Sequence, residues 1–221
     1  MNVVNESEMF DRIEKDLYTP VISDSLDSFG YRNCAMSYRI RPLREDFVFA
    51  GRARTFAWMD VFVPDPNPYK VEIEFMDKLK PGDVVVTNTD APLRNAPWGE
   101  LMSTAARARG ARAAVIDSCV RDVKKIFELN FPVFATAISP LDSNGRGRAV
   151  AYDVPVQCGG VLVNSGDLIM GDYDGIVVVP KKIEQEVLEL AFEKVSKEKM
   201  TRQELLDGKL MREVYDKYGV L

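Results

Sequence analysis

The chain of 221 residues contains no histidine. This absence excludes a Ser-His-Asp triad, a Cys-His pair, a histidine general base and a histidine-ligated zinc within one chain. Any catalysis must therefore use carboxylates, Arg, Lys, Tyr, backbone amides or a metal held by oxygen ligands. Oxygen ligation favours Mg²⁺, Mn²⁺ or Ca²⁺.

Cysteine is scarce, with Cys34, Cys119 and Cys158 far apart and no CxxC pair. The spacing argues against a zinc ribbon or a thioredoxin-like motif, and we expect three small buried hydrophobes. A sparse, odd number of cysteines is typical of a reducing compartment and predicts a cytoplasmic protein. The first residues have no basic region followed by an apolar stretch, so no signal peptide is expected. No apolar run is long enough to span a bilayer, so no membrane partner is expected.

The chain also lacks an excess of positive charge, because its net charge is -5 and it has no long run of Lys and Arg. Nucleic acid is therefore not an expected partner. No glycine-rich loop follows an early strand, which argues against methyl transfer. The hydrophobic fraction of 46% and the charged fraction of 29% are ordinary for a globular protein with a sizeable core.

Up to about residue 137 the alternation of predicted helices and strands indicates parallel α/β units, whereas from residue 148 short strands with tight turns are predicted. Helices are predicted over residues 6–17, 19–29, 71–79, 99–109, 121–129, 181–200 and 202–218. Strands are predicted over residues 48–58 (a strand pair or one bulged strand), 84–86, 113–116, 133–137, 150–156, 160–163, 167–170 and 175–179. Thr19 is predicted to cap the second helix, with Pro20 at its first position, and residues 88–97 form a polar loop. No repeat or linker divides the chain, so we expect one α/β domain over residues 1–180 and a helical tail over 181–221, packed on the body or on a neighbouring subunit.

The segment Trp98-Gly99-Glu100-Leu101-Met102 is the first candidate site. Gly99 allows a sharp turn into a helix, and the first-turn amides of Leu101 and Met102 have no helical acceptor. With the positive end of the helix dipole behind them, they suit a small anion such as a carboxylate. The alternative is that Glu100 only stabilises a helix N-terminus.

The second candidate is Arg121-Asp122, which like the first is predicted to follow a buried strand. Loops at the carboxyl ends of strands in an open α/β sheet are where ligands bind. Arg121 can grip a carboxylate or a developing enolate, and Asp122 can bind a hard cation. The alternatives are a surface ion pair or a helix cap, and Asp117 is either a further acid of the site or a turn residue.

Glu100, twenty residues and then Arg121-Asp122 together resemble the signature of the RraA-like superfamily. Three further segments are similar to this family, namely TPVISDSLDSFG at 19–30, KPGDVVV at 80–86 and GGVLVNSGDLIMGDYDGIVVVP at 159–180. Its catalytic members are the 4-hydroxy-4-methyl-2-oxoglutarate / 4-carboxy-4-hydroxy-2-oxoadipate aldolases, which are class II pyruvate aldolases.

The resemblance implies a swivelling β/β/α-type single domain, a homotrimer or hexamer, and an interface site with Mg²⁺ or Mn²⁺. By position, Asp122 would bind the metal directly and Glu100 would hold it through water. Arg121, with Gly99 and the amides of Leu101 and Met102, would bind the pyruvyl part of the substrate. An acid from the neighbouring subunit's C-terminal helix is matched by Glu198.

Four positions depart from the family pattern and affect the expected substrate more than the fold. Glu100 stands where Asp is usual, Lys125 where an acid is frequent, Ser118 where Gly is usual and Asn164 where Pro is usual.

The resemblance predicts a lyase that releases pyruvate from a 4-hydroxy-2-oxo acid, or from oxaloacetate by decarboxylation, through an enolate. A Schiff-base aldolase would need a buried lysine, but lysines such as Lys124, Lys125, Lys181 and Lys182 lie in charged runs. The main alternative is a regulator that binds ribonuclease E without catalysis, and another is an inactive structural relative.

Overall fold

The computed structural model describes residues 5–88 and 93–219, so parts of the predicted N-terminal segment and of the 88–97 loop lie outside the described residues. The helices are α1 (Glu6–Asp16), α2 (Thr19–Ser28), α3 (Lys70–Asp77), α4 (Glu100–Ala108), α5 (Val123–Leu129), α6 (Glu184–Leu206) and α7 (Met211–Tyr218), with a 3₁₀ turn at Lys181–Ile183. The strands are β1 (Arg41–Pro42), β2 (Phe49–Asp60), β3 (Asp83–Thr87), β4 (Ala113–Val120), β5 (Val133–Ile138), β6 (Gly147–Tyr152), β7 (Val156–Cys158), β8 (Val161–Val163), β9 (Leu168–Gly171) and β10 (Ile176–Val179).

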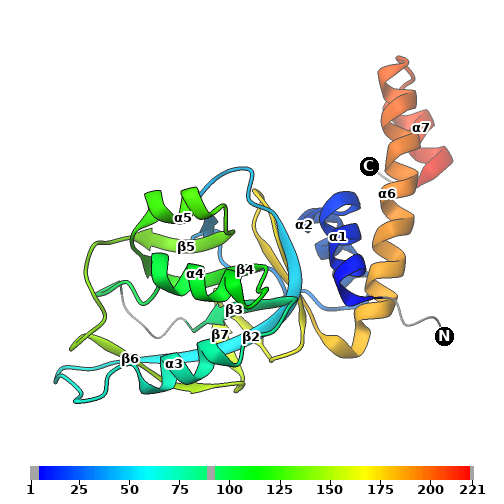
Figure 1. Ribbon diagram of the computed structural model, residues 1–221. Coiled ribbons are helices and arrows are strands. Elements are labelled where there is room, and N and C mark those ends of the chain that lie inside the picture. Colours follow the sequence, from blue (N-terminus) through cyan, green and yellow to red (C-terminus); the bar gives the residue numbers. More distant parts are fainter. Residues whose placement is uncertain (1–4, 89–92, 220–221) are drawn as a thin grey trace.

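A mixed, curled sheet forms the centre of the molecule (Figure 1). Its strand order is β1-β5-β4-β3-β2-β9-β10, with β6 also paired to β2. Strands β2, β3, β4 and β5 are parallel to one another, whereas β1, β6, β9 and β10 pair in antiparallel fashion. This confirms the predicted α/β class and its helical C-terminal tail.

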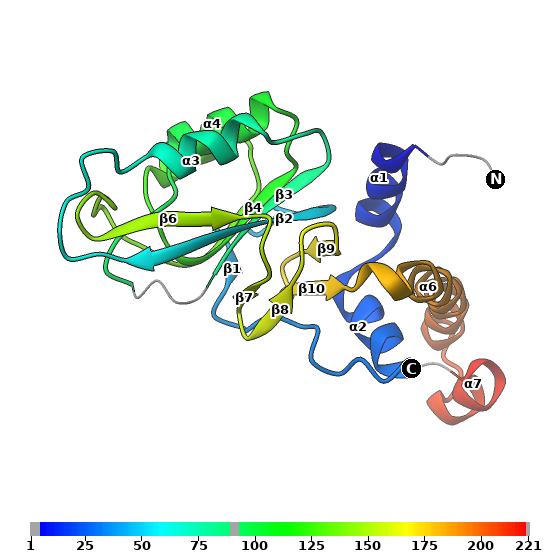
Figure 2. The ribbon, with the colours of Figure 1, turned by 90° about the horizontal axis from the view of Figure 1, so that it is seen from below.

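Both faces of the sheet are covered, which explains the continuous apolar runs of its strands. Successive side chains of β3 point to opposite faces, so Val85 packs beneath α3, α4 and α5 while Val84 and Val86 pack toward the β7–β8 hairpin. Figure 2 shows α3 and α4 on one side of the sheet and the hairpin on the other. A third cluster joins α1, α2 and α6 to β9 and β10.

The bulged-strand alternative for residues 48–58 is confirmed, because β2 is one strand with a bulge between Ala57 and Trp58. Other predicted boundaries are wrong for identifiable reasons. The predicted strand 150–156 is broken at Asp153, whose φ of 56° lies in the left-handed region. Thr19 is not the cap of α2 but its first residue, because Tyr18 takes the cap position. Asp172 instead accepts hydrogen bonds from the Thr19 amide and hydroxyl, both at 2.7 Å.

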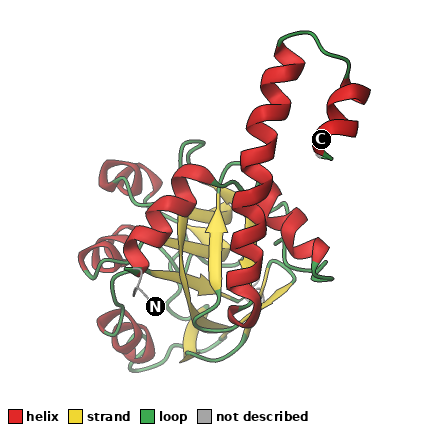
Figure 3. Ribbon diagram, turned by 90° about the vertical axis from the view of Figure 1, so that its right-hand side faces the viewer, coloured by secondary structure: helices red, strands yellow, loops and turns green. Residues whose placement is uncertain are grey.

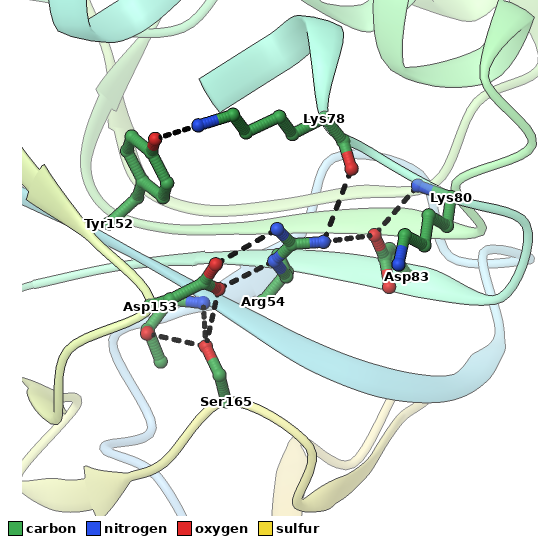
Figure 4. Close-up of polar contacts among 8 residues, drawn as sticks. Arg54, Lys78, Lys80, Asp83, Tyr152, Asp153 and Ser165 are labelled. Carbon is green, nitrogen blue, oxygen red and sulfur yellow. Dashed lines mark hydrogen bonds and ion pairs between the residues drawn. The ribbon is translucent and has the colours of Figure 1, made fainter. Parts of the chain in front are cut away.

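A polar network ties the Asp153 turn to the sheet (Figure 4). The Arg54 guanidinium donates Nη2 to Asp153 Oδ2 at 2.9 Å and Nη1 to Asp83 Oδ2 at 3.2 Å. Ser165 Oγ donates to Asp153 Oδ1 at 3.0 Å. Burial is the largest single influence on the pKa of Asp153 and raises it, but the hydrogen bonds from Arg54 and Ser165, together with the charges of Arg54 and Lys78, outweigh burial and lower that pKa. The network therefore fixes the chain where β6 leaves the sheet.

The first half of α6 packs on the body through Val187, Ala191 and Val195, which belong to the cluster with α1 and α2. The second half projects away from the sheet, and α7 folds back beside it (Figure 3). The predicted break between residues 200 and 202 is wrong, because α6 runs unbroken to Leu206. Among residues 5–88 and 93–219, no helix combines the length and apolar character needed to cross a bilayer.

Candidate functional site

The two candidate segments meet in the fold. The Arg121 amide donates to the Trp98 carbonyl at 3.0 Å, and Trp98 and Val120 form a parallel bridge. The Trp98 indole is buried and donates to Ser103 Oγ at 2.8 Å, and that hydroxyl donates to the Gly99 carbonyl at 2.9 Å. The start of α4 is thereby held against the end of β4.

Gly99 allows the close approach of these segments. A Cβ placed on Gly99 would lie 2.7 Å from Asp122 Oδ2 and 3.1 Å from Arg121 Cγ. The φ of Gly99 is -158°, an extended conformation that any residue can adopt. Glycine is therefore required here for space and not for backbone conformation.

Asp122 occupies the cap position of α5, yet its side chain does not cap that helix. Its Oδ2 accepts a long bond of 3.4 Å from the Glu100 amide and lies 3.8 Å from Arg121 Nε. The φ of Asp122 is 57°, a strained conformation for a residue other than glycine, although Asp tolerates it better than most. The backbone thus turns an exposed carboxylate toward α4, and the helix-cap alternative is wrong.

Arg121 forms its shorter ion pair with a residue that the sequence analysis did not select. Its Nη1 lies 3.1 Å from Asp142 Oδ1, in the loop after β5. About 38% of the side chains of both Arg121 and Asp142 is exposed, so the guanidinium remains accessible to a ligand.

The first turn of α4 contributes the other predicted residues. Glu100 Oε1 accepts from Thr104 Oγ1 at 2.9 Å, so this carboxylate lies along its own helix. The Leu101 side chain is 78% exposed, while Met102 is half-buried against the helix-side core. The amides of Leu101 and Met102 have no acceptor one turn earlier in the helix.

A cleft of about 470 Å³ joins these residues. The α4 start with Arg121 and Asp122 lines one part of it, and α3 lines another, with Asp142 and Ser143 of the loop after β5 completing the lining beside Arg121. From α3 the residues that line it are Tyr69, Glu72, Ile73, Met76 and Asp77. Gly99, Glu100, Leu101, Met102, Arg121 and Asp122 therefore line one cavity, as the sequence analysis expects of a shared site.

Glu72 is the most perturbed acid of this cleft. Burial, and then the Asp142 carboxylate, raise its pKa to about 7, with Arg121 opposing the rise. Burial and the Asp142 charge likewise raise the pKa of Tyr69, whose hydroxyl lies 3.5 Å from Asp142 Oδ2. A carboxyl group that titrates near neutral pH is suited to proton transfer.

Two of the cleft residues were missed by the sequence analysis for different reasons. Asp142 follows the predicted strand 133–137, so the rule that ligands bind at the carboxyl ends of strands could have found it. Glu72 lies within a predicted amphipathic helix and belongs to no motif. Nothing in the sequence distinguishes it from the solvent-facing acids of the same helix.

Two other candidate acids lie elsewhere in the chain. Asp117 lies within β4, where its carboxylate accepts from Thr136 Oγ1 at 3.0 Å and from the Gly159 amide at 2.6 Å. Its contacts are those of a residue that fixes the loop between β7 and β8. Glu198 lies on α6, where it accepts a hydrogen bond from Tyr18, outside the cleft formed by its own chain.

The residues that line the cleft fit a hard cation that keeps part of its water. No three acidic or cysteine side chains among residues 5–88 and 93–219 are grouped closely enough to hold a metal by themselves. However, Asp122 presents an exposed carboxylate, and all the acidic groups of the cleft offer oxygen. Mg²⁺ prefers oxygen and is commonly bound by one or two carboxylates with several waters retained.

Comparison with known proteins identifies the family of this chain. The family model described as RraA-like, Aldolase/RraA, matches residues 19–178. A relative from Halalkalibacterium halodurans named "putative 4-hydroxy-4-methyl-2-oxoglutarate aldolase" is 33% identical over 199 residues, which cover 89% of each chain.

Two solved structures have similar folds. One, described as novel cellulases from microbes associated with the gut ecosystem, is 32% identical with a TM-score of 0.85, over 90% of this chain and 89% of that one. The other is Streptomyces coelicolor RraAS2, described as an unusual member of the RNase ES inhibitor RraA protein family. It is 28% identical with a TM-score of 0.80, over 89% of this chain and 98% of that one.

The sheet, its three core layers and the C-terminal helices define a mixed α/β domain of the RraA-like type. The chain belongs to the Aldolase/RraA family.

Proposed function

We propose that this protein is a carbon–carbon lyase that releases pyruvate from a 4-hydroxy-2-oxo acid and also decarboxylates oxaloacetate. The observation that carries the proposal is that Arg121 and Asp122 share one cleft with the first turn of α4. The relative named as an aldolase supports the same reaction class.

Arg121 and the amides of Leu101 and Met102 would bind the carboxylate and 2-oxo group of the substrate. These donors act without reorganisation as negative charge develops on the 2-oxo oxygen. The C3–C4 bond then breaks, its electron pair remains on the pyruvyl part as an enolate, and C4 becomes a carbonyl. Glu100 would accept the proton of the C4 hydroxyl through a water molecule.

Asp122 would hold Mg²⁺ or Mn²⁺ directly, Glu100 would reach it through water, and Glu198 of a neighbouring subunit would contribute a further acid. When bound, the ion supplies a Lewis acid that polarises the 2-oxo group. This arrangement requires a homotrimer or hexamer with sites at subunit interfaces. The exposed Leu101 and the projecting half of α6 are compatible with such contacts.

The test is pyruvate release from oxaloacetate or a 4-hydroxy-2-oxo acid, with Mg²⁺ or Mn²⁺ and with or without EDTA. Release that depends on the metal supports the lyase. A matched variant, Lys124→Gln on α5, removes an exposed charge outside the cleft and should retain full activity. Failure to release pyruvate from either substrate class contradicts the proposal.

The second candidate is a regulator that binds ribonuclease E, which the similarity to RraAS2 favours. A regulator needs a surface and not a metal site. Purified ribonuclease E retained on the immobilised protein, together with no metal-dependent pyruvate release, would favour this function over the lyase.

A further inference from the structure

Acidic side chains outnumber cationic side chains in the described lining of the cleft. Arg121 is the one cationic side chain among the described residues that form its walls, whereas the acidic side chains come from α3, α4, the end of β4 and the loop after β5. These acids are Glu72, Asp77, Glu100, Asp122 and Asp142.

The two walls differ in chemistry. The wall with Arg121 and the α4 amides suits the carboxylate and 2-oxo group of a substrate. The lining from α3 combines apolar contact from Ile73 and Met76 with the carboxyl group of Glu72, and Asp142 lies against Arg121 at 3.1 Å. Once Arg121 binds the first carboxylate, no second cationic side chain of the described residues remains in the lining of the cleft, and a metal ion held by Asp122 would be engaged by the 2-oxo group.

A second substrate carboxylate would therefore face acids of the same sign. Like charges brought together in a partly desolvated site disfavour binding. A hydroxyl group, in contrast, can donate to a carboxylate and accept from a protonated carboxyl group. Glu72 can supply either partner near neutral pH, because burial and Asp142 raise its pKa to about 7.

We propose that the half of the substrate distal to the 2-oxo acid is uncharged and carries hydroxyl groups, which Glu72 and Asp142 recognise. This inference rests on the proposed lyase function and assigns its substrate class. It separates this chain from an aldolase of 2-oxoglutarate derivatives, whose substrates end in a second carboxylate, and it makes oxaloacetate, which also ends in a second carboxylate, the slower of the two proposed substrates.

The reaction is balanced without an added oxidant or reductant. In 4,5-dihydroxy-2-oxopentanoate, the C3–C4 bond breaks and its electron pair forms the enolate of pyruvate. The C4 hydroxyl loses its proton as C4 becomes the aldehyde of glycolaldehyde, and C3 of the enolate takes up one proton to give pyruvate. In 4-hydroxy-2-oxopentanedioate, the same steps give pyruvate and glyoxylate.

These two compounds form a matched pair, because they differ only in a terminal CH₂OH or carboxylate. With Mg²⁺ and the full chain, we expect kcat/KM for the hydroxyl-terminated compound to be about tenfold higher or more. Equal or faster cleavage of the carboxylate-terminated compound overturns the inference while leaving the proposed lyase intact.

Two variants test whether Glu72 causes the preference for the hydroxyl-terminated substrate. Glu72→Gln keeps the shape of the side chain and removes its charge, and should raise kcat/KM for the carboxylate-terminated compound about threefold to tenfold. Glu74→Gln makes the same change on α3, but Glu74 bonds to Lys78 and Tyr152 outside the cleft. It should leave the ratio between the two substrates unchanged. An unchanged ratio in Glu72→Gln also contradicts the inference.

Binding separates this inference from the lyase proposal. By calorimetry with Mg²⁺, 5-hydroxy-2-oxopentanoate should bind at least about fivefold more tightly than 2-oxoglutarate, which differs only in its terminal group. This preference supports the inference even if no cleavage is found, in which case the lyase proposal alone fails. The opposite preference, or binding of neither compound at millimolar concentration, overturns the inference.

Discussion

At the scale of the residue, Gly99 controls the spacing between α4 and the Arg121-Asp122 pair. Its replacement by Ala would place a Cβ 2.7 Å from Asp122 Oδ2, so this carboxylate or the α4 start must move. We expect Gly99→Ala to lower kcat for pyruvate release about tenfold or more, because displacements below 1 Å disturb a reacting geometry. The extended backbone at Gly99 predicts a melting temperature close to that of the wild type. Steady-state kinetics with thermal unfolding tests this, and an unchanged kcat contradicts it.

Glu72 predicts a pH dependence of stability. An unfolded Glu loses its proton near pH 4.5, but the folded protein keeps it until about pH 7. The folded state therefore binds more protons between these values, and stability falls as pH rises from about 4.5 to 7.

After allowance for solvent screening, the loss attributable to Glu72 should be about 1–2 kcal/mol. Denaturant unfolding in EDTA at pH 5 and pH 8 measures it. The Glu72→Gln variant should lose this part of the pH dependence of the free energy of unfolding. Glu74→Gln should keep it, because the Lys78 bond lowers the pKa of Glu74 and leaves it ionised throughout the window. An identical pH dependence of stability in Glu72→Gln and in the wild type would contradict its assignment to Glu72.

At the scale of the element, the start of α2 depends on a residue far away in the sequence. Asp172 is buried and accepts two bonds from Thr19. Asp172→Ala should lower the free energy of unfolding by about 1–3 kcal/mol, because it leaves a buried amide and hydroxyl without an acceptor. The neighbouring Asp174 is exposed, and Asp174→Ala is the control with little expected change. Equal stability of the two variants, measured by urea unfolding, would show that the bonds from Thr19 to Asp172 do not stabilise the start of α2.

The strands of the sheet could be predicted because both of their faces are buried, as in Val84-Val85-Val86. The hydrogen bonds from Thr19 to Asp172 at the start of α2 could not be predicted, because the two residues meet only through a tertiary contact. Nor could the break at Asp153, because it depends on Arg54 and Ser165, which lie far away in the sequence. The same distinction holds for the site. The spacing of the motifs predicts that Arg121 and Asp122 lie near α4. Glu72 belongs to the site only because α3 lines the same cleft.

At the scale of the whole molecule, the second half of α6 projects away from the sheet (Figure 3) and carries Glu198, the acid proposed to act in a neighbouring subunit. If Glu198 completes a neighbouring subunit's site, Asp122→Asn and Glu198→Gln damage different parts of one shared site. Co-expression of the two variants should then restore activity, because about a quarter of randomly mixed interfaces contain both intact parts. The comparison is the average activity of the separate variants. A mixture that only equals this average shows that sites are not shared through Glu198.

The proposed lyase requires that α4, Arg121 and Asp122 converge to stabilise a pyruvate enolate together with one divalent ion. Exchange of the methyl protons of pyruvate in D₂O, followed by proton NMR, measures enolate formation without knowledge of the distal half of the substrate. We expect exchange with Mg²⁺ and wild-type protein, and its loss with EDTA or in Asp122→Asn, whose side chain tolerates the same left-handed backbone. Exchange no faster than in buffer with Mg²⁺, or full exchange in Asp122→Asn, would contradict it.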